Sequence, residues 1–304
     1  MSSGNPSHSG AIIVPAHNEE GRIAPLLPVL AAAATELGYL VVIVCNGCHD
    51  RTADLARTAV GVKVLEFDWA SKNRALNEGE RVVGAVYPRL YVDADVRTST
   101  DTLRLLMDAL RVDEPLAVRP YETYLDDGAA WLVRAYHDAR YLWPLSRAWL
   151  EQHLEGHHIY GTNELGRLRF QAFPDDSLIM DDAFFDRMFD PNQKVAVEGA
   201  RVEVPLPRTT RELFRARVRI YQGNWRVTKW LETHEPDRVS IGQRPRIAPT
   251  TARERFRYYL QGGSLYPSWK PRDVLVISCS IALDQFAKLR AKWMDLSGQR
   301  APWR

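Results

Sequence analysis

Hydrophobic residues along the first hundred positions occur in short runs, separated by longer segments with helical periodicity. The apolar runs predict strands at 11–16, 40–45, 62–67 and 89–95. Between them, helices are expected over 19–37, from 52, and over 71–84. The second run, LVVIVC, is continuously apolar and rich in β-branched residues, which is typical of a strand buried on both faces. The alternation predicts an α/β fold with a mostly parallel central sheet flanked by helices.

The remainder of the chain is less regular and richer in helical pattern. The sequence predicts a strand near 115–122, a strand and turn leading to a short helix within 155–170, and a hairpin over 195–207. Helices are expected over 99–110, 129–150, 209–231, 250–261 and 272–294. No internal repeat or low-complexity linker occurs. One domain with a helical C-terminal extension is therefore the economical interpretation.

Composition excludes several classes of protein. The 304 residues carry a net charge of +2, 45% are hydrophobic and 26% charged, so an intrinsically disordered chain is excluded. Eighteen Gly are too few for collagen and three Cys too few for a disulfide scaffold. The sparse cysteines predict a cytoplasmic protein. The best apolar run, 274–283, is shorter than the roughly 20 residues of a spanning helix, which predicts a buried or interfacial helix.

Two common phosphate-binding motifs are missing. The first predicted strand is followed by PAHNEE rather than by a G-x-G-x-x-G turn, and no G-x-x-x-x-G-K-[ST] occurs. Hydride transfer on a Rossmann domain and P-loop hydrolysis are therefore not expected. The fourth strand ends instead in YVDADV, where Asp93 and Asp95 could hold Mg²⁺ or Mn²⁺ beside a diphosphate. A D-x-D sequence alone also suits a solvated turn, so the surrounding motifs are needed to choose between the two interpretations.

The surrounding motifs form an ordered series. VPAHNEE at 14–20, VCNGCHDRTADLA at 44–56 and SKNRALNEG at 71–79 precede YVDADV at 91–96. Together they resemble glycosyltransferase family 2, whose members use nucleotide sugars on the GT-A fold. The resemblance covers about 11–225. It implies a polar tail at 1–10, a GT-A catalytic domain at 11–232 (a nucleotide-binding half at 11–97, an acceptor half at 98–232) and a C-terminal extension at 233–304.

The resemblance also implies which residues bind the nucleotide and the cation. Asp93 and Asp95 match the family's metal and ribose motif, and the cation is expected to be Mn²⁺ or Mg²⁺. The donor is expected to be a nucleoside-diphosphate sugar, with UDP as the nucleotide. The implied nucleotide-binding residues are Pro15, Ala16, His17, Glu19, Asn46, Asp50, Lys72, Asp93, Ala94 and Asp95.

A second acidic pair supplies a candidate base. In an inverting transfer, a carboxylate takes the proton of the acceptor hydroxyl. Family members place this base in an acidic pair at the start of a helix, and MDDAFF offers Asp182, with Asp181 as the runner-up. An acidic helix N-terminus stabilised by the helix dipole would give the same pattern. The preceding pair, Asp175 and Asp176, is interpreted as a loop or cap, although a shift of one motif would exchange the two pairs.

A basic block distinguishes the later chain. Residues 201–260 hold 13 Arg and one Lys against six acids, a balance of +8. In processive members of the family a Q-R-x-R-W segment lies near the diphosphate, and here Ala216 and Ile220 replace its Gln and Trp, which favours transfer of a single sugar. Arg215 and Arg219, four residues apart, are predicted to bind the diphosphate.

Other features leave alternatives open. His157, His158 or His234 could complete the metal site, although a packed or exposed histidine is the ordinary interpretation. Retaining transfer on the same fold and a non-catalytic nucleotide-binding or membrane-peripheral scaffold are the competing functions. The acceptor is expected to be a hydroxyl, lipid-linked or on a glycan. No nucleic-acid module is present, and the C-terminal helices suit either peripheral contact with the inner face of a membrane or a homodimer.

Overall fold

A computed structural model describes residues 8–126, 128–142, 158–174, 180–239 and 271–301. The chain divides into two compact units. The first, here the sheet unit, comprises 1–125 and 153–205; the second, here the helical unit, comprises 126–152 and 206–304. The predicted helix over 250–261 lies outside the described residues.

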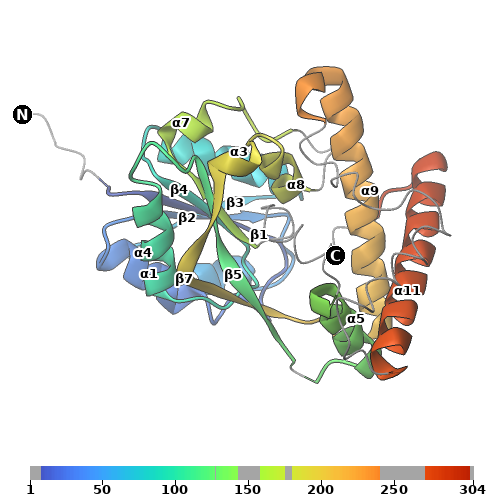
Figure 1. Cartoon of the computed structure of the whole chain (residues 1–304). Coiled ribbons are helices and arrows are strands. Elements are labelled where there is room, and N and C mark those ends of the chain that lie inside the picture. Colours follow the sequence, from blue (N-terminus) through green and yellow to red (C-terminus); the bar gives the residue numbers. More distant parts are fainter. Residues whose placement is uncertain (1–7, 127, 143–157, 175–179, 240–270, 302–304) are drawn as a thin grey trace, which may run out of the picture. The chain divides into compact units, whose positions relative to one another are not determined.

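The sheet unit is built on seven strands in the order β3-β2-β1-β4-β6-β5-β7 (Figure 1). Strands β1 to β4 are mutually parallel where they pair, and β6 runs antiparallel to both β4 and β5. β7 pairs parallel to β5. The predicted α/β fold with a mostly parallel sheet is thus confirmed. The strand bounds are β1 Ala11–Ala16, β2 Leu40–Asn46, β3 Lys63–Phe67, β4 Arg89–Val92, β5 Ala117–Leu125, β6 Ile159–Thr162 and β7 Lys194–Pro205.

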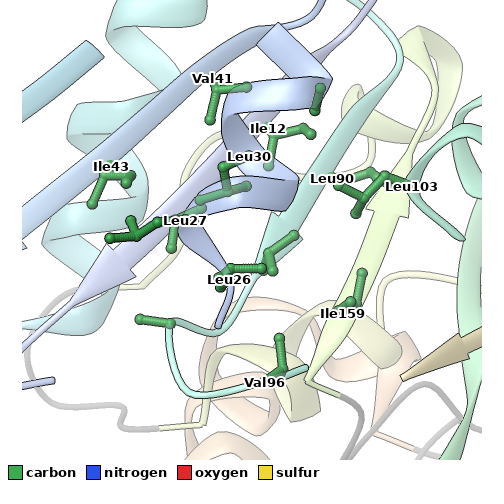
Figure 2. Close-up of a cluster of buried hydrophobic side chains, with 14 of the residues drawn as sticks. Ile12, Leu26, Leu27, Leu30, Val41, Ile43, Leu90, Val96, Leu103 and Ile159 are labelled. Carbon is green, nitrogen blue, oxygen red and sulfur yellow. The ribbon is translucent and has the colours of Figure 1, made fainter. Parts of the chain in front are cut away.

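The core forms where apolar strands meet the helices of the sheet unit. β1 is buried along its whole length, as its continuous apolar sequence predicts for an interior strand. Ile12 and Ile43 pack with Leu27 and Leu30 of the first helix, as Figure 2 shows. The helices of this unit are α1 Leu27–Thr35, α2 Thr52–Ala56, α3 Lys72–Val83, α4 Thr100–Ala109, α7 Glu164–Arg167 and α8 Asp181–Asp186.

The first helix is shorter than its sequence pattern predicts. We expected a helix over 19–37, but α1 begins only at Leu27, and turns occupy the preceding residues. Pro28 lies in the first turn of the helix, where its missing N–H costs nothing because no intrahelical acceptor is available there. Farther inside a helix the same proline would remove a hydrogen bond and clash. Residues 17–26, which were expected to be helical in part, instead form a loop after β1.

The predicted hairpin over 195–207 is also wrong. Residues 195–205 instead belong to one long strand, β7, which is paired parallel to β5. Gly199, with φ 81°, lies in an irregularity of this strand, where the register shifts between Arg119 and Tyr121 of β5. A glycine with positive φ accommodates a bulge as readily as a turn, so the sequence signal was ambiguous.

The helical unit consists largely of three described helices. They are α5 Trp131–Leu142, α9 Thr210–His234 and α11 Pro271–Leu296. α9 begins with a capping box, in which Thr209 and Glu212 satisfy each other's backbone N–H groups. α11 lies alongside α9, and small buried residues such as Ala287 and Ala291 lie in this contact. No described helix is long and apolar enough to cross a membrane.

Candidate functional site

Three parallel strands end beside one another, and the polar residues predicted from the sequence follow them. β1 ends at Ala16, β2 at Asn46 and β4 at Val92. β1 lies between the other two and pairs parallel to both. Because the carboxyl ends of parallel strands share one edge, the segments after them form a common polar edge, where ligands bind in open α/β sheets.

Asp93, Asp95 and His158 form a group of metal-ligating side chains at this edge, the one such group among the described residues. Their ligand atoms all lie within 4.8 Å of one another. The sheet brings His158 to the aspartates: Val92 pairs with Ile159, and the N–H of Asp93 donates to the carbonyl of His158 at 2.9 Å. Two carboxylates and an imidazole suit Mn²⁺ well, and the carboxylates also suit Mg²⁺. The donor set therefore fits a divalent cation.

The charges of this group are coupled. His158 Nδ1 lies 2.9 Å from Asp93 Oδ2. Burial disfavours the charged imidazole, but the hydrogen bond to Asp93 and its charge outweigh burial and raise the pKa of His158 to about 9. Burial also acts to raise the pKa of Asp93, yet Lys72 and His158 lower it well below its usual value. The charge of Lys72 and the hydrogen bond with His158 thus hold Asp93 ionised.

The other candidate histidines are not part of this group. His234, near the end of α9 in the helical unit, stacks on Trp230 with ring centroids 4.4 Å apart, and its Nδ1 lies 2.9 Å from the Trp230 carbonyl. His157 lies outside the described residues. His158 is therefore the histidine that the structure places beside Asp93 and Asp95.

Lys72 connects the metal-ligating group to the second acidic pair. Its Nζ lies 2.7 Å from Asp93 Oδ1 and 2.9 Å from Asp181 Oδ1. Lys72 is the first residue of α3, and the side chain of Ser71 caps that helix by accepting from the N–H of Arg74. Burial alone would lower the pKa of Lys72, but Asp181 and Asp93 raise it above its ordinary value. Lys72 is thus a fixed cation between two carboxylates.

Asp181 and Asp182 begin α8, as the sequence predicts, but their surroundings differ. Asp181 is only 2% exposed, and Tyr160 donates its hydroxyl to Asp181 Oδ2 at 2.5 Å. With Lys72 on the other oxygen, Asp181 is held on both sides. Asp182 is half-buried, and its Oδ1 accepts from the N–H of Ala183. Asp182 is therefore the more exposed of the two carboxylates.

Removing the Lys72 charge should destabilise the sheet unit. In Lys72→Met, Asp93 and Asp181 lose their shared cation, and uncompensated buried charge costs roughly 3 kcal/mol. For a unit of this size that cost corresponds to a melting midpoint roughly 6–12 °C lower. Differential scanning calorimetry measures the change. Lys63→Met, at an exposed position on β3, is the matched control and should leave the midpoint unchanged; equal midpoints for both variants would contradict the bridging role of Lys72.

The loops after β1 and β2 are bound to each other. His17 Nδ1 lies 2.6 Å from the carbonyl of Asn46, and the N–H of Glu19 donates to Thr52 Oγ1 at 2.7 Å. Asp50 accepts from the N–H groups of Glu20 and Thr52. Burial of Asp50 acts to raise its pKa, but these hydrogen bonds lower it. The two loops therefore form a single braced segment.

Asn46, the last residue of β2, contacts that segment through its backbone carbonyl. It is fully buried, its amide donates to the carbonyl of Ala16, and its Oδ1 accepts from the N–H of Ser71. The side chain thereby ties β1 to the start of α3. Both functions of the amide are occupied by backbone groups. Pro15 and Ala94 are buried beside the same edge.

Two residues of the edge gave no signal in the sequence. Arg22, in the loop after β1, brings a guanidinium nitrogen to 3.8 Å from Asp95 Oδ2 and remains 58% exposed. Tyr160 lies inside a short apolar strand, where a tyrosine is ordinarily a packing residue. Only the pairing of β4 with β6 and the position of α8 show that its hydroxyl meets Asp181.

The predicted diphosphate residues lie on α9 of the helical unit. Arg215 is exposed and Arg219 is half-buried. Arg217, between them, donates to Asp284 of α11 at 3.0 Å and to the hydroxyl of Tyr221 at 3.0 Å. It therefore holds α9 to α11. Asp175 and Asp176, the alternative acidic pair, lie outside the described residues.

Comparison with known proteins decides the family. The model of glycosyl transferase family 2 matches residues 11–171, more than half of the chain. The chain belongs to glycosyltransferase family 2. The family predicted from the motifs at the strand ends is therefore confirmed for this glycosyltransferase. No curated protein matches it significantly by sequence.

Solved structures share the GT-A fold of this glycosyltransferase. The mannosyltransferase PcManGT from Pyrobaculum calidifontis, in complex with GDP-Man and Mn²⁺, is 16% identical, with a TM-score of 0.63 over 97% of this chain and 90% of that chain. Glucosyl-3-phosphoglycerate synthase from Mycobacterium tuberculosis, in complex with Mg²⁺ and UDP, is 17% identical, with a TM-score of 0.50 over 78% of this chain and 81% of that chain. At such identities the likeness establishes the fold alone.

Proposed function

We propose that this glycosyltransferase is an inverting, cation-dependent enzyme that transfers one sugar from a nucleoside-diphosphate sugar to a hydroxyl acceptor. Asp182 is the general base, and Asp93, Asp95 and His158 hold the cation. One observation carries the proposal: Lys72 joins the metal-ligating group to the acidic start of α8 through two contacts of under 3 Å. This link between the two acidic groups supports placing the donor's cation and the acceptor's base on one polar edge.

The proposed step balances without any further reactant. Asp182 takes the proton of the acceptor hydroxyl as that oxygen bonds to the anomeric carbon. The bond from the anomeric carbon to the diphosphate breaks, and the nucleoside diphosphate departs with the electron pair. Asp93, Asp95 and His158 would hold a divalent cation, which would neutralise charge on the departing diphosphate. Asp181, held by Lys72 and Tyr160, positions the first turn of α8 and so the Asp182 carboxylate.

The nucleotide is proposed to lie against the braced segment after β1 and β2. Pro15, Ala16, His17 and Glu19 line it from the first loop, and Asp50 from the second. Because the Asn46 amide is occupied, Asn46 contributes by fixing this segment rather than by a free side chain. Arg215 and Arg219 are the proposed diphosphate ligands. UDP is the proposed nucleotide, as in the glucosyl-3-phosphoglycerate synthase structure.

A screen of donors tests this function without knowledge of the acceptor. Purified enzyme is incubated with UDP-, GDP- and dTDP-sugars in Mn²⁺, and release of the nucleoside diphosphate is measured. We expect slow hydrolysis of UDP-sugars that stops when EDTA is added. Release from GDP-sugars alone would overturn the assignment of UDP but preserve that of a glycosyltransfer site. Absence of hydrolysis together with absence of UDP binding by calorimetry would overturn the proposed nucleotide site.

A further inference from the structure

An exposed apolar stripe runs along α11 of the helical unit. Five large side chains on this helix are between 50% and 79% exposed. Exposed Ala282 falls on the same line. At 100° per residue all six positions lie within an arc of about 80°, and the stripe extends for about 31 Å. The large residues of the stripe are Leu275, Phe286, Leu289, Trp293 and Leu296.

The opposite face of α11 is packed within the helical unit. Ala287, Ala291 and Met294 are buried against α9, and Val276 and Ile277 against α5. A helix needs only one apolar face to pack on its own unit. The stripe is therefore a second apolar face, and an exposed apolar face of this kind marks an interaction surface.

Charge beside the stripe is basic. Arg290 and Lys292 are exposed on its two sides, and Arg272 is exposed near the start of the helix. The guanidinium of Arg290 lies over the ring of Trp293, 4.4 Å from its centroid. The stripe thus has cationic borders.

The described acidic side chains of α11 are engaged elsewhere. Asp284 accepts from Arg217 at 3.0 Å. Asp295 accepts from Arg226 at 3.3 Å and Lys229 at 2.8 Å. Both pairs connect α11 to α9, so these acids neutralise bases within the helical unit. They do not offset the charges of Arg290 and Lys292.

These charges discriminate between two occupants of the stripe. In a homodimer with parallel helices, Arg290 and Lys292 of one copy would lie beside the same bases of the other, which disfavours that pairing. In an antiparallel homodimer, Asp284 and Asp295 of α11 would give these bases no partner, because both acids are already bound to bases of α9. An anionic lipid surface offers acyl chains to Phe286, Leu289 and Trp293 and negative headgroups to both bases. Large apolar and aromatic residues bordered by Lys and Arg are the composition of interfacial helices.

We propose that the outer face of α11 docks on an anionic lipid bilayer. The helix lies in the plane of the interface, the stripe enters the boundary between headgroups and acyl chains, and Arg290 and Lys292 contact headgroup phosphates. The opposite face remains packed on α5 and α9, so docking requires no rearrangement of the helical unit.

Vesicle flotation with the full chain tests the proposal. Wild type should float with vesicles of equal parts phosphatidylglycerol and phosphatidylcholine, and much less with phosphatidylcholine alone. The triple variant Phe286→Gln/Leu289→Gln/Trp293→Gln should partition more weakly by more than roughly 100-fold. Arg290→Gln/Lys292→Gln should lose about 30-fold on the anionic vesicles. All these positions are exposed, so circular dichroism melting should match that of wild type.

A matched control removes exposed apolar surface elsewhere. Leu168 and Val60, on the sheet unit, are 76% and 71% exposed, and Leu168→Gln/Val60→Gln should float like wild type. Three outcomes overturn the proposal: wild type fails to float with anionic vesicles, the triple variant floats equally well, or the control loses as much as the triple variant. Dimers that the triple variant abolishes, found by ultracentrifugation without vesicle binding, would assign the stripe to a second copy instead.

Discussion

Asp182→Asn is expected to lower the rate of sugar transfer by about 10²–10⁴-fold, the usual contribution of a positioned general base. The carboxamide keeps the size of the side chain but cannot accept the acceptor proton. Donor affinity should stay within about threefold of wild type, since Asp182 acts on the acceptor rather than on the nucleotide. Steady-state kinetics and calorimetry with the donor measure the two effects. Nuclear magnetic resonance of the product should show the opposite anomeric configuration to the donor.

The control for Asp182 is a carboxylate with the same helical position. Asp101 lies in the first turn of α4 and is exposed, so Asp101→Asn removes a comparable interaction with a helix dipole. It should leave transfer unchanged. If Asp182→Asn retained most of its activity, or if both variants lost activity equally, Asp182 would not be the base. A product with retained configuration would point to the alternative chemistry, which needs no acceptor base.

The second large effect on the transfer rate is expected when the cation site is lost. Asp95→Ala removes one of the three donors in the metal-ligating group, and the transfer rate should fall by at least about 10²-fold, or several kcal/mol of transition-state stabilisation. Chelation of wild type with EDTA should have the same effect, and added Mn²⁺ should restore activity. His158→Ala should weaken Mn²⁺ binding by at least roughly tenfold, as even second-shell losses do.

A direct measurement of Mn²⁺ binding tests the metal-ligating group independently of catalysis. Electron paramagnetic resonance of free Mn²⁺ gives the affinity without a turnover assay. His234→Ala is the matched control, because His234 stacks on Trp230 in α9 and is outside the metal-ligating group. It should bind Mn²⁺ like wild type. Equal Mn²⁺ affinity in Asp95→Ala, His158→Ala and wild type would contradict the assignment of the site.

Local patterns predicted the strands well but some connections poorly. β1 and β2 were predicted correctly because a continuous apolar run indicates a strand that is buried on both faces. The start of α1 was missed because helical periodicity continues upstream of Pro28, although a proline is best accommodated in the first turn. β7 was mistaken for a hairpin because Gly199 suits a bulge as well as a turn. Such ambiguities are resolved only by the partner strand.

In the candidate site, too, local motifs predicted some features and tertiary packing decided others. Asp93, Asp95 and the pair at 181–182 were named from motifs, because strand ends and helix starts are visible in a sequence. The sequence did not show that Asp181 is buried and paired while Asp182 is half-buried. That difference arises from the contacts of Asp181 with Lys72 and Tyr160, which lie more than twenty positions earlier in the chain. Asn46 was predicted to bind the nucleotide, and only the packed structure shows that its amide ties two segments together.

The sequence by itself determined the family, the α/β class and the carboxylates at the ends of the elements, because periodicity and motif spacing are local properties of the chain. Tertiary structure decided which histidine joins Asp93 and Asp95, which acid of the second pair is buried, and which face of α11 stays exposed. Each of these depends on register and packing between segments far apart in the sequence. Burial and pairing set the charge and the availability of a side chain, and neither is encoded at a single position.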